Sequence, residues 1–237
     1  AARRSTELAP TFGATWIRLA ELEFSFDARN EAQRILPKGL LLSPEQAQGQ
    51  SLLGFIALEN NYNQSALDSF EHAIELDGDL GSAWLGKGIA LLNQRHSEKG
   101  RAALQTAAAL EPQRSLFRSY LAKAFGELDD EALAIKEFGI AKTLDPSDPT
   151  PDFYAALHAF QGNRINESIR MLERSVALND NRSVHRSRSL LDRDLAMRSA
   201  DLSILYAEAG MKDVSDYLAT RSILKDPTNF SGHLFLA

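Results

Sequence analysis

The chain has 237 residues, of which 44% are hydrophobic and 24% charged, and its formal net charge is −6. This composition is typical of globular proteins, and the absence of cysteine excludes disulfides, thiolate metal sites and a thiol nucleophile. A pI near 5.4 argues against a nucleic-acid partner, and no apolar run approaches the roughly 20 residues that direct membrane insertion requires.

A repeat of 34 residues organises the sequence from residue 13 onward. Residues 1–12 form a lead-in that has no initiating Met and no apolar signal stretch. Six repeats are predicted at 13–46, 47–80, 81–114, 115–148, 149–182 and 196–229, with an insertion at 183–195 before the sixth. Residues 230–237 begin a seventh, truncated repeat, so we expect a longer parent protein to continue past residue 237.

Each repeat is predicted to form a pair of helices. Apolar residues recur with a period near 3.6, which predicts helix A at repeat positions 2–14 and helix B at positions 18–31. Positions 8, 20 and 27 hold only Gly, Ala or Ser in all six repeats, so we expect the helices to approach closely there. Pro at position 32 in four repeats should end helix B, because Pro cannot continue the helical hydrogen-bond ladder.

The pattern Trp-x-x-Leu-Gly, followed by spaced Tyr, Ala, Phe, Ala and Pro, resembles the tetratricopeptide repeat (TPR). The resemblance covers residues 13–229 and implies an all-α, right-handed superhelical solenoid that binds proteins or peptides. Position 4 holds Trp16 and Trp84 in two repeats, whereas three others depart from the pattern with Gln50, Arg118 and Asp152. Pro37 lies inside helix B of the first repeat, which we expect to be kinked or shortened.

The insertion region is rich in arginine although the chain as a whole is acidic. One interpretation is a site for an anion or carboxylate, because guanidinium groups bind such ligands in a bidentate manner. The alternative is a solvated loop or helix extension in which Asp192 and Asp194 neutralise part of the charge. The candidate anion contacts are Arg182, Arg186, Arg188 and Arg193.

The sequence from Asn179 onward is also similar to the TPR region of large bacterial proteins with an outer-membrane β-barrel, some of which carry a FecR-like domain. The match includes Asp226–Asn229 and Ser231–Ala237, and Arg193 departs from the acidic residue expected there. This resemblance implies a periplasmic or outer-membrane-associated arm that could self-assemble as a homo-oligomer. Without it, a cytoplasmic location is the default expectation.

The sequence contains no complete catalytic motif. Gly81–Lys87 has the spacing of a nucleotide-binding loop, but Gly88 follows where a Ser or Thr hydroxyl is needed for Mg²⁺. The five histidines have no metal-ligand spacing, and no nucleophile elbow occurs. We therefore predict no catalytic residue, cofactor or metal, and expect a non-enzymatic chain. An accessory helical domain of a larger enzyme remains an alternative.

The strongest functional candidate is a stripe on the A helices. Positions 5, 9 and 12 share one helix face, which the TPR resemblance places on the concave side of the solenoid. Such an apolar stripe predicts a partner segment laid along the groove, or else packing between adjacent repeats. Lys123 is the one plausible cation, which departs from the carboxylate clamp of chaperone-binding relatives. The predicted groove residues are Phe55, Leu58, Leu85, Ile89, Leu92, Ser119, Lys123, Phe153, Leu157 and Phe160.

Overall fold

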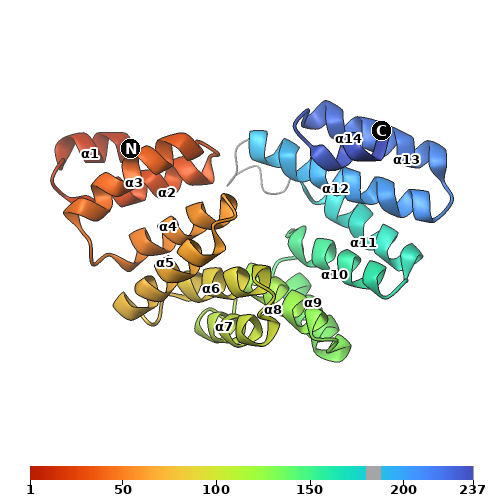
Figure 1. Cartoon of the computed structure of the whole chain (residues 1–237), viewed down its shortest axis with the longest axis horizontal. Coiled ribbons are helices and arrows are strands. Elements are labelled where there is room, and N and C mark those ends of the chain that lie inside the picture. The colour runs from red at the N-terminus through yellow and green to blue at the C-terminus, as the bar shows by residue number, and fades with distance from the viewer. Residues whose placement is uncertain (180–187, 237) are drawn as a thin grey trace. The chain divides into compact units, whose positions relative to one another are not determined.

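The computed structural model describes residues 1–179 and 188–236, and over these residues the fold is all-α (Figure 1). The chain divides into two compact bodies, an N-terminal body Ala1–Asp129 and a C-terminal body Asp130–Ala237. The N-terminal body contains α1 (Ala2–Leu8), α2 (Gly13–Ser25), α3 (Arg29–Leu42), α4 (Ala47–Glu59), α5 (Asn63–Leu76), α6 (Gly81–Asn93), α7 (Ser97–Leu110) and α8 (Ser115–Glu127). The C-terminal body contains α9 (Glu131–Leu144), α10 (Thr150–Gln161), α11 (Ile165–Ala177), α12 (Arg188–Glu208), α13 (Lys212–Lys225) and α14 (Phe230–Leu236).

The predicted helix pairs are confirmed to within about a residue at most ends. In the first four repeats, helix A occupies positions 1–13 and helix B positions 17–30. One helix and one helix extension were not predicted. The lead-in contains α1, which contacts α2 and pairs Arg3 with Glu23 at 2.8 Å. Helix A of the sixth repeat starts early, because α12 begins at Arg188 inside the insertion.

The same turn joins helices A and B throughout. Position 15 has a positive φ in every repeat, which lets the backbone reverse direction directly after helix A. In five of the six repeats the N–H of position 16 then donates to the carbonyl of position 11, as from Tyr62 to Ala57 at 2.9 Å. The residues with positive φ are Asp27, Asn61, Arg95, Asp129, Asn163 and Gly210.

The small residues at positions 8, 20 and 27 are all buried, which confirms the predicted close approach of the helices. A Cβ added at Gly88 would lie 2.5 Å from Cγ of Leu104, so no larger residue fits without movement. In the C-terminal body the small residues include serines, and the hydroxyls of Ser168, Ser215 and Ser222 donate to a carbonyl of the facing helix. Ser168 donates to Ala156 at 2.7 Å, so burying this hydroxyl leaves no unsatisfied donor.

The prediction that Pro37 shortens its helix is wrong. α3 is 14 residues long, the same length as α5 and α7. Pro37 removes the N–H that would bond to the Gln33 carbonyl, but both residues are exposed. Water can therefore hydrate that carbonyl, while Leu36 and Gly39 keep the buried face of α3 intact.

Position 4 has a hydrogen-bonding role that explains its preference for Trp. In the first three repeats and at the start of α14, the side-chain nitrogen at this position pairs with the carbonyl six residues earlier, which links the start of the helix to the preceding turn. Gln50 keeps this bond despite departing from Trp, and His233 repeats it at the start of α14. The four bonds are Trp16 Nε1 to Pro10 O (2.9 Å), Gln50 Nε2 to Pro44 O (3.4 Å), Trp84 Nε1 to Gly78 O (2.8 Å) and His233 Nε2 with Pro227 O (2.9 Å).

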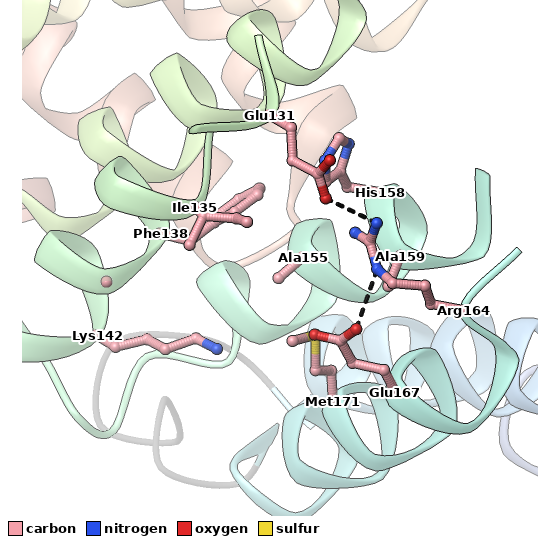
Figure 2. Close-up of a pocket in the computed structure, with 11 residues that line it drawn as sticks. Glu131, Ile135, Phe138, Lys142, Ala155, His158, Ala159, Arg164, Glu167 and Met171 are labelled. Carbon is pink, nitrogen blue, oxygen red and sulfur yellow. Dashed lines mark hydrogen bonds and ion pairs between the residues drawn. The ribbon is translucent and has the colours of Figure 1, made fainter. Parts of the chain in front are cut away.

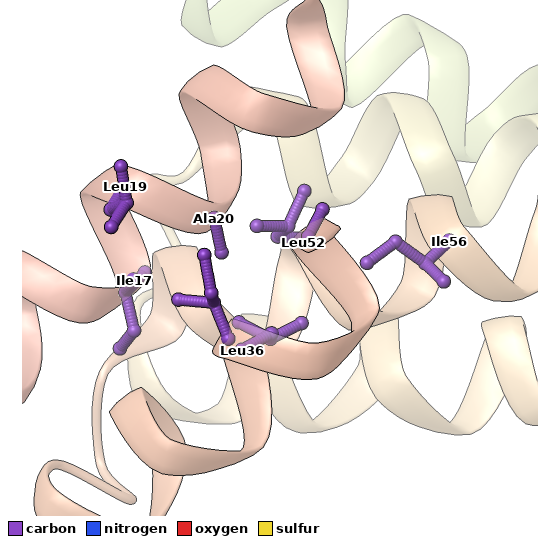
Figure 3. Packing of buried hydrophobic residues seen from close by; sticks show 8 residues of the cluster. Ile17, Leu19, Ala20, Leu36, Leu52 and Ile56 are labelled. Carbon is purple, nitrogen blue, oxygen red and sulfur yellow. The ribbon is translucent and has the colours of Figure 1, made fainter. Parts of the chain in front are cut away.

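Each body has its own hydrophobic core. In the N-terminal body, α2, α3 and α4 enclose a cluster that includes Ile17, Leu36 and Leu52 (Figure 3). A second cluster centres on Phe70, whose ring faces both Gly54 and Gly86. The core of the C-terminal body consists of Ala156, Ile169, Leu172, Leu202, Leu205 and Leu218.

Candidate functional site

The predicted stripe on the A helices is distributed over both bodies. In the N-terminal body α4 contacts α6 and α6 contacts α8, so these helices carry their stripe residues side by side. Phe55 and Leu58 lie on α4, with Leu85, Ile89 and Leu92 on α6 and Ser119 and Lys123 on α8. In the C-terminal body α10 carries Phe153, Leu157 and Phe160.

Much of this stripe contributes to packing. Leu85 is 4% exposed, Leu92 5% and Ser119 0%, so a ligand cannot reach their side chains. Phe55 is half-buried and stacks edge to face on Phe70, with ring centroids 5.0 Å apart. Packing between adjacent repeats therefore explains the buried part of the stripe. Only its half-buried residues have surface that a partner could contact.

The half-buried residues are partly apolar and partly charged. Lys123 is 30% exposed and pairs with Glu127 of the same helix at 3.4 Å. On α10, Phe153 and Phe160 pack against the core of the C-terminal body and are also half-buried. The guanidinium of Arg198 lies 5.8 Å from the Phe153 ring centroid, which places a cation beside the stripe that the sequence reasoning missed.

The arginine-rich insertion is only partly described. Arg182 and Arg186 lie outside the described residues, and Arg188 is at the start of α12. Arg193 is exposed on α12. A hydrogen bond from Thr228 is the main cause of the lowered pKa of Asp226, and the charge of Arg193 lowers it further. The anion site therefore stays a prediction.

The segment that mimics a nucleotide-binding loop is helical. Gly81 is the first residue of α6, and the helix continues through Gly86 and Lys87 to Asn93. Lys87 pairs with Glu71 of α5 at 2.9 Å. A phosphate-binding loop requires successive backbone N–H groups that are free to point at the ligand, and the interior of a helix does not supply them.

The C-terminal body contains a hollow of about 420 Å³ between α9, α10 and α11, which we call the α9–α11 pocket (Figure 2). Phe138 and Met171 contribute apolar surface, and Ile135 stands at the mouth with 57% of its surface exposed. The helix positions that face the hollow include Gly139, Ala155 and Ala159, whose small size leaves the space open. No motif or spacing in the sequence predicts this pocket.

Ion pairs border the α9–α11 pocket at both ends. Arg164 joins the N-terminal ends of α9 and α11 by pairing with Glu131 at 2.7 Å and Glu167 at 3.0 Å. At the opposite end, where Figure 2 shows Lys142, this lysine pairs with Asp152 at 2.6 Å. Asp152 is only 3% exposed and also pairs with Arg174 of α11 at 3.1 Å, so a buried carboxylate with two cations replaces Trp at position 4.

His158 is the polar residue of the pocket that lacks a complete set of partners. Its Nε2 is buried and has no hydrogen bond to any residue that the structure describes. Figure 2 shows the imidazole at the same end of the pocket as Glu131 and Arg164. An unpaired buried polar atom costs free energy, and because this nitrogen has almost no accessible surface, a ligand in the hollow does not reach it.

The sequence matches no protein-family model and no curated protein. Solved structures do resemble it. The Cut9–Hcn1 hetero-tetramer of the APC/C aligns with a TM-score of 0.75 at 19% identity, over 98% of this chain and 44% of that one. The present chain therefore spans less than half of that protein's length. TTC0263, a thermophilic TPR protein from Thermus thermophilus, aligns with a TM-score of 0.68 at 15% identity, over 79% of this chain and 95% of that one.

A third structure is YrrB, described as a TPR protein with an unusual peptide-binding site. It aligns with a TM-score of 0.52 at 18% identity, over 75% of this chain and 92% of that one. The chain has the tetratricopeptide-repeat fold. In TPR terms, the predicted stripe belongs to the A helices, whereas the α9–α11 pocket opens between the B helices of the fourth and fifth repeats. No helix of the described TPR residues combines the length and apolar character needed to cross a lipid bilayer.

Proposed function

We propose that this TPR chain is a non-catalytic scaffold that binds a polypeptide segment along the stripe on its A helices. The observation that carries the proposal is the set of half-buried side chains on that stripe, which are Phe55, Leu58, Ile89, Lys123, Phe153, Leu157 and Phe160. Within each body, side chains of this kind retain accessible apolar area on packed helices, which suits the burial of an apolar partner segment. YrrB, whose fold is similar, is described as binding peptides.

The test is to select peptides from a phage library of random 12-residue sequences on the full chain and to measure their affinity by fluorescence anisotropy. Ile89→Glu puts a charge on the stripe, and we expect it to weaken binding at least about tenfold. Leu133→Glu is the matched control, because Leu133 is 37% exposed on α9, a B helix, and lies outside the stripe. Circular dichroism should show unchanged helicity for both variants. Equal affinity of the two variants would remove the stripe from the binding surface.

Self-association is a second candidate, favoured by the apolar surface of the last two helices. Leu224 is 79% exposed, Phe230 74% and Leu234 65%. Apolar side chains exposed on two helices that contact each other, as α13 and α14 do, are typical of interaction surfaces. Light scattering across a range of concentrations should then report a mass that rises with concentration, whereas a constant monomer mass contradicts this candidate. A periplasmic or outer-membrane-associated location remains a prediction from resemblance.

A further inference from the structure

The outer face of α13 exposes large apolar side chains. In all six B helices, repeat positions 19, 22, 26 and 29 are exposed or half-buried, and their spacing places them on one helix face. On α13 these positions hold Val214, Tyr217, Arg221 and Leu224, which together we call the α13 face. Val214 is 41% exposed, Tyr217 64% and Leu224 79%. Because the same positions are accessible in the interior repeats, stacking of neighbouring repeats does not cover this face.

The α13 face differs from the equivalent face of the other five B helices. α9 comes nearest, with Leu133 and Ile140 at two of the four positions, and α3 has only Leu41. α5, α7 and α11 hold polar residues, charged residues or alanine at all four positions. The repeat fold therefore does not require apolar side chains on this face, and three of them on one helix are typical of an interaction surface.

The spacing of the α13 face fits a second helix of the same kind. Its residues follow one another at intervals of three, four and three, which is the spacing of the seam between the helices of a coiled coil. The face is also symmetric about Ala219, because Val214 and Leu224 lie five residues to either side of it, and Tyr217 and Arg221 two. Two copies that run antiparallel can therefore align all four residues at once, as a two-fold axis requires.

Charge favours the antiparallel arrangement over the parallel one. In a parallel pair Arg221 would face Arg221 of the other copy, and two like charges would meet in the seam. In an antiparallel pair its guanidinium faces the Tyr217 ring of the other copy, where a cation–π contact stabilises it. The N-terminal half of α13 contains one lysine and two aspartates, whereas the C-terminal half contains one arginine and one lysine. An antiparallel pair therefore also brings the acidic half of each helix to the basic half of the other.

We propose that two copies of this chain form a dimer through their α13 faces, with the two α13 helices antiparallel. Val214 of each copy then packs against Leu224 of the other, and each Arg221 guanidinium stacks on the Tyr217 ring of the other copy. Burial of the apolar side chains supplies the affinity, and the arginine–tyrosine pairs set the direction of the helices. The dimer rests on the self-association candidate of the proposed function and does not involve the stripe on the A helices.

Sedimentation equilibrium of the full chain at several concentrations tests the dimer and its face. The unmodified chain should show a monomer–dimer equilibrium. Leu224→Glu should weaken it at least about 100-fold, because the charge enters the interface twice. Leu133→Glu is the matched control, since Leu133 is 37% exposed and holds on α9 the repeat position that Val214 holds on α13. It should leave the dissociation constant unchanged, and circular dichroism should show equal helicity for both variants.

Leu234→Glu separates this dimer from self-association through another surface. Leu234 is 65% exposed on α14 and lies outside the α13 face, so the dissociation constant should not change. A dimer that survives Leu224→Glu but not Leu234→Glu would overturn the α13 face and keep the self-association candidate. A monomer at every concentration would refute both and leave the α13 face to a different partner. Peptide binding to the stripe is measured separately, so its failure is distinguishable from either result.

Arg221→Glu tests the direction of the helices. In an antiparallel pair it removes both cation–π contacts and should weaken the dimer about tenfold. In a parallel pair it would replace one like-charge contact by another, so an unchanged dissociation constant would overturn the antiparallel arrangement. Lys136→Glu makes the same change of charge on the outer face of α9, where Lys136 is exposed, and should have no effect.

Cysteine cross-linking tests the register, because the chain contains no cysteine of its own. An oxidised mixture of Val214→Cys and Leu224→Cys chains should yield a disulfide-linked dimer, since these positions face each other in the proposed interface. Either variant alone should stay unlinked, because the two equivalent residues lie about 15 Å apart along the antiparallel helices. Cross-linking of Val214→Cys with itself, or no cross-link in the mixture, contradicts the assignment.

Discussion

Ser199 shows how the insertion changes the environment of a single side chain. It stands at position 4 of the sixth repeat, and its buried hydroxyl has no hydrogen bond to any residue in the described part of the chain. In the first three repeats the position-4 side chain pairs with the carbonyl six residues earlier, in the turn before helix A. Six residues before Ser199 is Arg193, which lies inside α12. Inside a helix each backbone carbonyl accepts a hydrogen bond from an N–H group of the same helix. The extension of α12 therefore leaves no free turn carbonyl as an acceptor for the Ser199 hydroxyl.

Asp201, also on α12, makes the stability of the chain depend on pH. Burial raises the pKa of Asp201 to about 6, although the charge of Arg198 opposes this rise. The group binds a proton more tightly when folded than when unfolded, so its charged form costs stability above pH 6 and this cost is relieved as the pH falls toward 4. We expect Asp201→Asn to stabilise the chain at pH 7.5 by about 1–2 kcal/mol and to have much less effect at pH 4.5.

Urea unfolding at the two pH values measures this effect. Glu208→Gln is the matched control, because Glu208 is an exposed carboxylate near the end of the same helix. It should leave the free energy of unfolding unchanged at both values. A uniform stabilisation by Asp201→Asn at pH 4.5 and 7.5 would show that burial of the charge is not the cause.

Among the helices, the same substitution should have opposite effects at two glycines. Gly→Ala in a helix normally stabilises by about 1 kcal/mol, and Gly139 has the open space to realise that gain. At Gly88 the new methyl group would lie 2.5 Å from Cγ of Leu104, which is fully buried and cannot move aside. We expect Gly88→Ala to destabilise by about 1–3 kcal/mol. Melting temperatures from circular dichroism should rise for Gly139→Ala and fall for Gly88→Ala, and a rise for both would contradict the close contact between α6 and α7.

Periodicity explains why the helix pairs were predictable from sequence. Small residues at positions 8, 20 and 27 reflect contacts between helices that recur in every repeat, so six copies of the signal reinforce one another. α1 was missed because residues 1–12 carry no copy of the pattern, and the extension of α12 lies in the one segment that interrupts it. Arg95 shows a further limit, since its positive φ follows from its place in the turn and not from its residue type.

The candidate site was harder to predict, because the solvent exposure of a side chain depends on residues that are distant in the sequence but close in the fold. The spacing of positions 5, 9 and 12 placed ten residues on one helix face, but it did not separate buried Leu85 from half-buried Ile89. The α9–α11 pocket left no motif at all. Its lining combines residues of α9, α10 and α11, such as Phe138, Ala155 and Met171, and their spacing in the sequence does not show that they meet.

At the scale of the whole molecule, each body has a core of its own, and repeat proteins unfold in local cooperative segments. Phe70 is fully buried in the N-terminal body, so Phe70→Ala should cost about 3–5 kcal/mol there. We expect amide hydrogen exchange to accelerate at least about 100-fold in α4, α5 and α6, with little change in α10 to α13. Leu172→Ala removes an equally buried side chain from the C-terminal body and should give the reverse pattern. If both variants accelerate exchange equally along the whole chain, the two bodies unfold as one cooperative domain, and the division at Asp129 has no energetic meaning.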